Sequence, residues 1–221
     1  MVIEPFVLDF LTDLEQNNNR EWFQQNKKRY DVALKNVHEF VNQIIAGVSV
    51  FDASISSQNA KDCIFRIYRD MRFSHDKTPY KTHFGAFITP NGKKCGDAGY
   101  YIHIQNNASF LTGGLWSPEP AVLKKIREEI YYAPEELVAV IEDKTFKSAF
   151  GKLIEIDNLK NPPKNYPADF QYVDLLKYKH FCAEKAVSNA EITAGDFFEK
   201  CLKTLEISAP LVKYMNKLIY V

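Results

Sequence analysis

The residues best suited to chemistry lie in one stretch of the chain, the basic segment 65–87, which reads FRIYRDMRFSHDKTPYKTHFGAF. Fixed cations alternate there with aromatic rings and two histidines. Guanidinium groups bind carboxylate or phosphate in a bidentate manner, and an ammonium group supplies a point charge. From Lys61 to Lys94 the chain carries eight Lys or Arg and three Asp, a local net charge of +5. So much positive charge requires an anionic ligand or carboxylates elsewhere in the fold.

Three interpretations of the basic segment remain open. The leading one is a basic, aromatic-lined pocket for an anionic small molecule, phosphorylated or carboxylate. In the second, Asp62, Asp70, Asp76, Glu119 or Glu128 neutralise the cations as a structural ion-pair network. The third is a non-catalytic module that binds protein or nucleic acid through a basic face, although 28 basic and 28 acidic side chains disfavour nucleic acid without excluding it. The ligand-binding residues expected for the pocket are Arg66, Arg69, Arg72, Lys77, Tyr80, Lys81 and Trp116.

Two histidines are the candidates for acid–base catalysis. His83 and His103 fall on different predicted strands and would lie side by side if those strands pair. Together with Asp76 or Asp97 they are also conceivable metal ligands. No metal ion is expected, however, because no H-x-H or H-E-x-x-H spacing occurs and the surrounding positive charge would repel a cation. No residue pair establishes a mechanism, so whether the protein is an enzyme stays open.

Glycines, a serine and aromatic rings complete the candidates. Gly113-Gly114, placed between a predicted strand and a helix capped by Ser117, would let backbone N–H groups approach an anion, or simply form a tight turn. No Walker or dinucleotide fingerprint follows, and no cofactor is expected. Ser74 adjoins His75 without a nucleophile-elbow motif. Seven aromatic residues could line a stacking surface or fill the core: Tyr68, Phe73, Tyr80, Tyr100, Tyr101, Trp116 and Tyr166.

The amino-acid composition is typical of a folded globular protein. The 221 residues are 46% hydrophobic and include 30 aromatic side chains (16 Phe, 12 Tyr, 2 Trp). The N-terminus lacks a signal-peptide pattern, and no apolar run approaches the roughly 20 residues of a membrane span. The four cysteines, Cys63, Cys95, Cys182 and Cys201, form no C-x-x-C pair. We therefore expect a reduced cytoplasmic protein without a membrane segment; nothing in the sequence specifies its oligomeric state.

Periodicity predicts an α+β fold, an antiparallel sheet of four or more strands flanked by N-terminal and C-terminal helices. One domain, 1–221, is expected, with a helical part at 1–50, a sheet-rich core at 61–116 and a helical and loop elaboration at 117–221. Strands are predicted at 63–68, 80–88, 99–105, 109–115 and 178–187. Helices are predicted at 6–14, from Asn19 to a stop at Gly47, from Ser117 through Ile130, at 134–142 and 145–150, and over 194–219 with a break near Pro210.

Several motifs in order resemble one family. They are Asn17–Phe23 (NNNREWF), Phe65–Asp70 (FRIYRD) followed by Arg72-Phe73, Lys77–Lys81 (KTPYK), Gly113–Trp116 (GGLW) with Pro118, and Asn161–Lys164 (NPPK) with Tyr166-Pro167. The chain resembles the family known as domain of unknown function 2461 over most of its length. The resemblance implies a single α+β domain and carries no established activity. Asn165 and Phe170 stand where the family pattern leads us to expect Gly and His.

Overall fold

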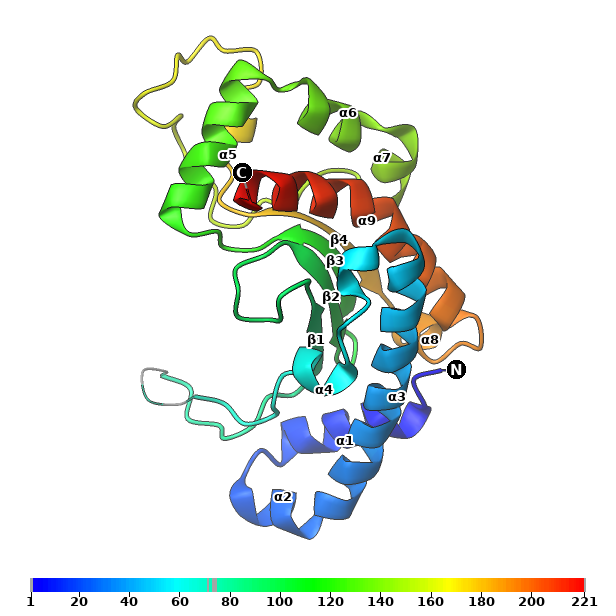
Figure 1. Ribbon diagram of the computed structural model, residues 1–221. Coiled ribbons are helices and arrows are strands. Elements are labelled where there is room, and N and C mark those ends of the chain that lie inside the picture. Colours follow the sequence, from blue (N-terminus) through cyan, green and yellow to red (C-terminus); the bar gives the residue numbers. More distant parts are fainter. Residues whose placement is uncertain (1, 71, 73–74, 221) are drawn as a thin grey trace.

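The computed structural model describes residues 2–70, 72 and 75–220, and four strands form one antiparallel sheet in this part of the chain (Figure 1). The strands occur in the spatial order β1 (Phe84–Ile88), β2 (Gly99–Ile104), β3 (Ser109–Leu115) and β4 (Phe181–Val187). Helices precede and follow the sheet in sequence, which confirms the α+β class. Phe73 and Ser74 lie outside the described residues.

The described residues form nine α-helices. They are α1 (Pro5–Gln16), α2 (Arg20–Gln25), α3 (Lys27–Phe51), α4 (Ala60–Cys63), α5 (Pro120–Tyr132), α6 (Glu135–Glu142), α7 (Lys144–Phe150), α8 (Asn189–Ile192) and α9 (Phe197–Tyr220), with short 3₁₀ turns at Ala53–Ile55 and Leu175–Lys177. No helix of the described chain is long and apolar enough to cross a membrane.

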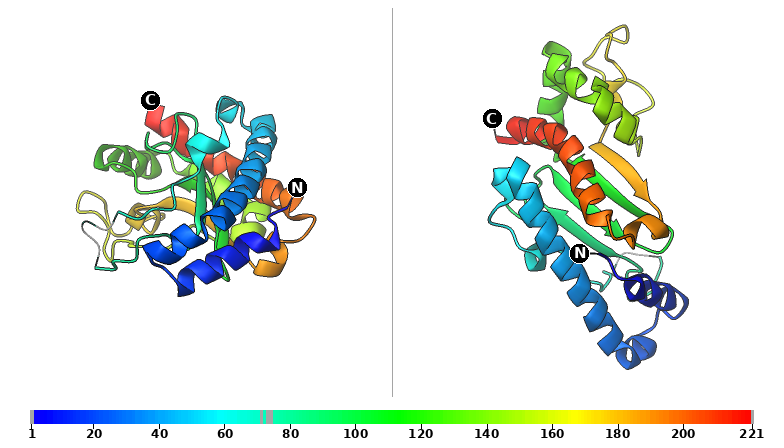
Figure 2. Two further views of the ribbon diagram at one scale, coloured as in Figure 1. Left: turned by 90° about the horizontal axis from the view of Figure 1, so that it is seen from below. Right: turned by 90° about the vertical axis from the view of Figure 1, so that its right-hand side faces the viewer.

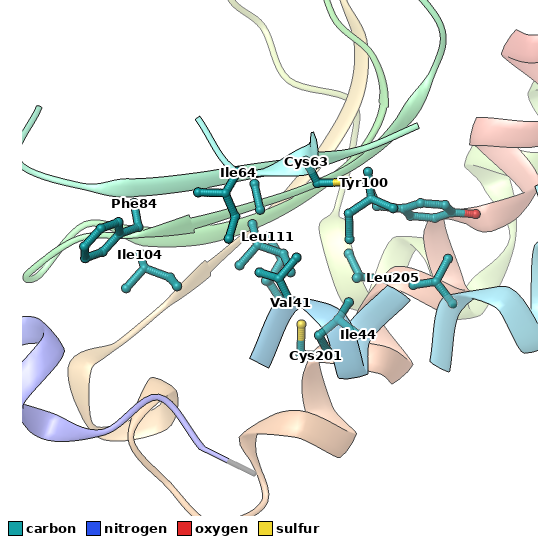
Figure 3. Close-up of a cluster of buried hydrophobic side chains, with 14 of the residues drawn as sticks. Val41, Ile44, Cys63, Ile64, Phe84, Tyr100, Ile104, Leu111, Cys201 and Leu205 are labelled. Atoms are coloured by element: carbon teal, nitrogen blue, oxygen red, sulfur yellow. The ribbon is translucent and has the colours of Figure 1, made fainter. Parts of the chain in front are cut away.

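The core lies between the sheet and the two long helices. In the right-hand view of Figure 2, α3 and α9 both lie in front of the strands. Because side chains alternate along a strand, Phe84 of β1, Ile104 of β2 and Leu111 of β3 point toward these helices and are buried (Figure 3). Val41 of α3 and Leu205 of α9 meet them from the other side. We call this the helix face of the sheet; its residues alternate with those of the outer face.

Close contact of α9 with its neighbours depends on two glycines. A Cβ atom at Gly113 would lie 2.0 Å from Ser208 Oγ, and one at Gly47 would lie 2.5 Å from a methyl group of Leu202. The predicted helix stop at Gly47 is therefore wrong, because α3 continues to Phe51 and the glycine makes room for α9. The predicted second helix is also divided at Asn26, whose side chain donates a hydrogen bond to Trp22 O.

The predicted break at Pro210 is wrong as well, since α9 runs without interruption from Phe197 to Tyr220. Proline removes one helical hydrogen bond and crowds the preceding turn, which normally ends or bends a helix. Here residues on both sides of Pro210 are buried: Leu205 and Ala209 before it, Leu211 and Val212 after it. Packing on the sheet offsets the local cost.

Two expectations at the end of β3 are corrected. Gly113 and Gly114 do not form a turn but pair within the sheet, opposite Tyr100 and Gly99 on β2. Ser117 does not cap a helix: it has a positive φ of 48°, and α5 begins at Pro120 after Glu119. The backbone N–H of Ser117 donates to His180 Nδ1 instead. Gly113 therefore makes room for α9, and Gly114 makes room for the backbone of β4 at Phe181.

The strand predicted at 63–68 is reduced to two isolated bridges. Ile64 pairs with Ala86 and Tyr68 pairs with Tyr80. Cys63 belongs to α4, which Asn59 caps by accepting the N–H of Asp62. The predicted strand 80–88 is likewise shortened to β1, Phe84–Ile88. The basic segment thus enters the sheet only at its end.

Candidate functional site

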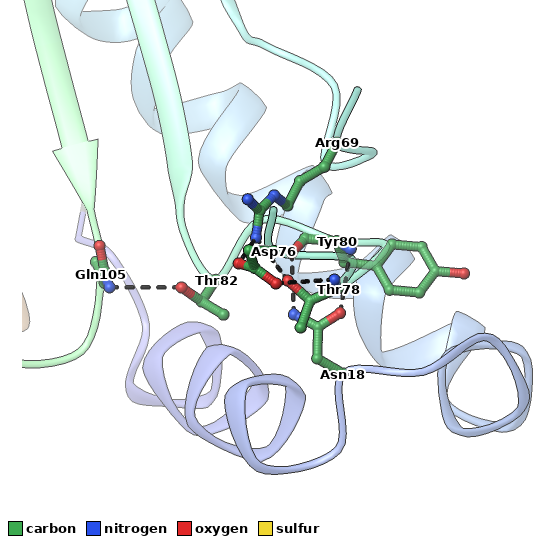
Figure 4. Close-up of polar contacts among 7 residues, drawn as sticks. All are labelled: Asn18, Arg69, Asp76, Thr78, Tyr80, Thr82 and Gln105. Carbon is green, nitrogen blue, oxygen red and sulfur yellow. Dashed lines mark hydrogen bonds and ion pairs between the residues drawn. The ribbon is translucent and has the colours of Figure 1, made fainter. Parts of the chain in front are cut away.

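A pocket of about 570 Å³ lies where the turn between α1 and α2 meets the basic segment. Asn18 of that turn holds the two parts together, because its Nδ2 donates to Tyr80 O (2.9 Å) and its Oδ1 accepts from Tyr80 N (3.1 Å) (Figure 4). The Tyr80 ring stacks on Phe23 of α2, with ring centroids 4.0 Å apart. The pocket is lined by Glu15, Asn18, Arg69, Asp70, Asp76, Thr78, Tyr80, Lys81, Thr82 and His83.

Two of the predicted arginines are neutralised by nearby aspartates. Arg69 forms an ion pair with Asp76, and Arg72 binds both carboxylate oxygens of Asp70. The backbone N–H of Thr78 and the Arg69 guanidinium lower the pKa of Asp76 to about 2. The Arg72 side chain lowers the pKa of Asp70 to about 2 in the same way. The structural ion-pair interpretation therefore accounts for Arg69 and Arg72.

A second set of cations differs from these. Lys81 lies at the pocket wall with its Nζ 5.1 Å from the centroid of the Phe65 ring, and Lys93 Nζ lies 5.5 Å from the same centroid. Burial, followed by the positive charges of Arg66 and Lys93, lowers the pKa of Lys81. Lys93 Nζ donates to the backbone carbonyls of Asp62 (2.6 Å) and Ile64 (2.8 Å). Within the described residues, the ion pairs with carboxylates include none from Arg66, Lys81 or Lys93. We call these three side chains the cation cluster.

The two candidate histidines lie side by side, as the strand pairing predicted. Their ring centroids are 4.2 Å apart, and His103 also stacks on Phe110 of β3 at 4.5 Å. His83 immediately precedes β1, in which Gly85 lies opposite His103. Burial, with smaller contributions from His103, Lys81 and Arg69, lowers the pKa of His83 to about 4. His83 is therefore neutral at neutral pH.

A chain of hydrogen bonds connects β2 with the pocket. Gln105 Nε2 donates to Thr82 Oγ1 (3.5 Å; Figure 4). This turns Gln105 Oε1 toward His103 Nε2, at 2.8 Å. His103 must then carry its proton on Nε2, and its Nδ1 accepts from the Tyr101 hydroxyl (2.9 Å). This hydrogen-bond chain fixes the tautomer of His103, a buried histidine whose ring lies next to that of His83. The imidazole of His83 is suited to orienting a ligand by a hydrogen bond, and its pKa near 4 makes it a weak general base at neutral pH. Both ring nitrogens of His103 are already engaged, by Gln105 and Tyr101.

The remaining predicted site residues lie elsewhere. Trp116, at the far end of β3, stacks on His180 with centroids 4.0 Å apart and is not among the residues that line the pocket. Lys77 is exposed and is not among them either. Tyr100 belongs to the core, where its hydroxyl donates to Asp52 (2.9 Å). Tyr166 contacts the ring of Tyr131 on α5.

Sequence reasoning missed Asn18, Thr82, Gln105 and Lys93. Gln105 could have been found from its spacing, because it follows His103 by two residues and so shares its face of the strand. Asn18 could be recognised only as a helix breaker, since its partner Tyr80 is 62 residues away. No group of three or more His, Cys, Asp or Glu side chains in the described part of the chain is placed to hold a metal ion.

Comparison with family models identifies the family of this chain. The model of the family described as "Conserved hypothetical protein (DUF2461)" matches residues 6–214, nearly the whole chain. A search of curated proteins and a search of solved structures each returned no match. The family match spans the pocket, the cation cluster and the histidine pair, and its description names no activity.

Proposed function

This chain belongs to the DUF2461 family, and we propose that it binds a small anion, a phosphate or carboxylate group, through the cation cluster of Arg66, Lys81 and Lys93. The observation that carries the proposal is the environment of Lys81. Its ammonium group is partly buried, is repelled by two other cations, and forms no ion pair with a carboxylate of the described chain. An anion bound there would stabilise a charge that the fold leaves uncompensated.

Two features favour a position of the proposed anion near Lys81 rather than near Arg69. Glu15, Asp70 and Asp76 line the other part of the pocket, and two of these carboxylates are held ionised by arginines. Because these aspartates already neutralise Arg69 and Arg72, the two arginines have little positive charge left to attract an anion to that part. Next to Lys81 the pocket offers the Thr82 hydroxyl and the neutral imidazole of His83 as hydrogen-bonding groups. The structural ion-pair interpretation explains Arg69 and Arg72 but does not explain Lys81.

Thermal unfolding with added anions tests the proposal. The melting temperature of the wild type is measured in inorganic phosphate, pyrophosphate and citrate, with sodium chloride balancing ionic strength. A ligand at one hundred times its Kd stabilises the folded state by about 2.7 kcal/mol. For a chain of this size that corresponds to a rise of roughly 5–10 °C. We expect at least one of the three anions to raise the melting temperature in a saturable manner.

Two variants separate a bound anion from a general salt effect. Lys81→Gln removes the central cation, and Lys160→Gln removes an exposed lysine of the segment between α7 and β4 as a matched control. Without anion, Lys81→Gln is expected to melt no lower than wild type, because it removes a partly buried charge that its neighbours repel. With anion, only Lys81→Gln is expected to lose the increase. No increase in wild type, or an undiminished one in Lys81→Gln, would contradict the proposal.

A further inference from the structure

The outer face of the sheet, next to the cation cluster, carries a group of aromatic rings. The Tyr101 ring lies 6.5 Å from Phe87 on β1, 5.7 Å from Phe110 on β3 and 6.5 Å from Phe65, between centroids. Gly85 makes room for this arrangement, because a Cβ atom there would lie 2.5 Å from the Tyr101 hydroxyl oxygen. Rings from three strands and the preceding segment thus meet on one surface.

These rings are only partly buried, unlike their neighbours on the helix face. Phe87, Tyr101 and Phe110 each retain exposed area, whereas Phe84 and Ile102 on the same strands are fully enclosed. The rings are tilted relative to one another, Phe87 to Tyr101 by 65° and Tyr101 to Phe110 by 45°. They therefore present both faces and edges, and aromatic faces of this kind bind planar heterocycles by stacking.

Charge along the outer face limits what can bind there. Phe65 joins the rings to the cation cluster, since the ammonium groups of Lys81 and Lys93 both lie over its ring. At the opposite edge, β4 carries the exposed carboxylate of Glu184 in register with Thr112 of β3. A single-stranded nucleic acid crossing the sheet would place a phosphate near this carboxylate. A ligand with one phosphate at one end and a ring at the other meets no such repulsion.

From these observations we infer that the ligand is a nucleoside monophosphate, with its phosphate at the cation cluster and its base against Phe87, Tyr101 and Phe110. The inference rests on the proposed anion site and assigns the remainder of the ligand. The neutral imidazole of His83 lies at the pocket wall with Lys81 and supplies a hydrogen bond to the sugar or base, whereas His103 stacks on Phe110 and has both ring nitrogens engaged by Gln105 and Tyr101. Removal of the base should weaken binding by roughly tenfold or more, because stacking of one base contributes about that much.

Calorimetric titration of the full chain with four probes tests the inference: inorganic phosphate, ribose 5-phosphate, adenosine 5′-monophosphate and a short oligothymidylate. The monophosphate is expected to bind at least tenfold more tightly than ribose 5-phosphate. Phe87→Leu and Phe110→Leu should each reduce that ratio several-fold and leave the affinity for ribose 5-phosphate unchanged. Tyr132→Leu, which removes an exposed ring of α5, is the matched control and should change neither affinity. Circular dichroism verifies that each variant is folded.

Each other outcome has a distinct meaning. Equal affinity for ribose 5-phosphate and the monophosphate would overturn the inference while leaving the proposed anion site intact. A base preference that survives both Leu variants would place the base elsewhere and overturn the assignment to this face. Tighter binding of the oligothymidylate than of the monophosphate would overturn the inference and indicate that the ligand is a single-stranded nucleic acid. If no phosphate-bearing probe binds, the proposed function itself fails.

Discussion

Protonation of His83 should destabilise the fold in a defined pH range. Burial, followed by His103, Lys81 and Arg69, lowers the pKa of His83 from 6.5 to about 4 in the folded protein. The unfolded chain keeps the ordinary value. Below about pH 6.5 the unfolded state therefore binds a proton that the folded state does not, and stability falls until about pH 4. Above about pH 6.5 this contribution to stability is fully present.

The size of the effect follows from the two pKa values. The difference between 6.5 and about 4 corresponds to about 3.4 kcal/mol when the full range is traversed. Between about pH 7.5 and about pH 5 the expected loss is about 2 kcal/mol. Asp70 and Asp76, with pKa values of about 2, lose their contribution only at lower pH. Measurement at about pH 5 therefore isolates the histidines from these carboxylates.

Urea unfolding of wild type and His83→Gln at the two pH values measures the effect. Burial also lowers the pKa of His38, His103 and His180, so both proteins lose some stability on acidification. The wild type is expected to lose about 2 kcal/mol more than His83→Gln. His75→Gln, a change at an exposed histidine, should retain the wild-type loss. Equal losses in wild type and His83→Gln, or an NMR titration midpoint of His83 near 6.5, would refute the reasoning.

Two further predictions concern how the site is supported. Gly113→Ala should destabilise the protein by about 1–3 kcal/mol, because the new Cβ would lie 2.0 Å from Ser208 Oγ. In urea titrations, adding Ser208→Gly to Gly113→Ala should recover part of that loss of stability, and Gly195→Ala, where a Cβ meets open space, serves as control. If Gly113→Ala left the stability unchanged, α9 would not pack closely against Gly113. Asn18→Ala should accelerate hydrogen exchange of the Tyr80 amide and cost about 1–3 kcal/mol, since both backbone groups of Tyr80 lose their partner. Unchanged exchange at Tyr80 would contradict this role of Asn18.

Local patterns in the sequence were sufficient for most of the secondary structure. Alternation along residues 99–105 and 109–115 predicted β2 and β3, and the same alternation separates the buried Ile102 from the outward-facing Tyr101. Gly151, with a φ of 73°, ends α7 directly after Phe150, where the predicted helix 145–150 stops. The juxtaposition of His83 and His103 also followed, because antiparallel pairing of consecutive strands is a short-range consequence of the turn between them.

Where helices and strands end was decided by packing that no local pattern contains. Gly47 and Pro210 have the local character of a helix stop, yet each lies inside a long helix. Burial of α9 against the sheet and α3 outweighs the local preference at Pro210. Gly113 likewise resembles a turn residue but provides contact space for Ser208.

In the candidate site, too, the sequence determined some properties and the tertiary structure decided others. Residue types alone determined that the basic segment carries excess cations and two histidines. Only the tertiary structure decided which cations are compensated, because an ion pair depends on the relative positions of side chains within a few ångströms. Arg69 and Arg72 meet Asp76 and Asp70, whereas Lys81 meets Phe65 and further cations. Burial of Lys81 and of the histidines, which sets their pKa values, arises from the same long-range packing.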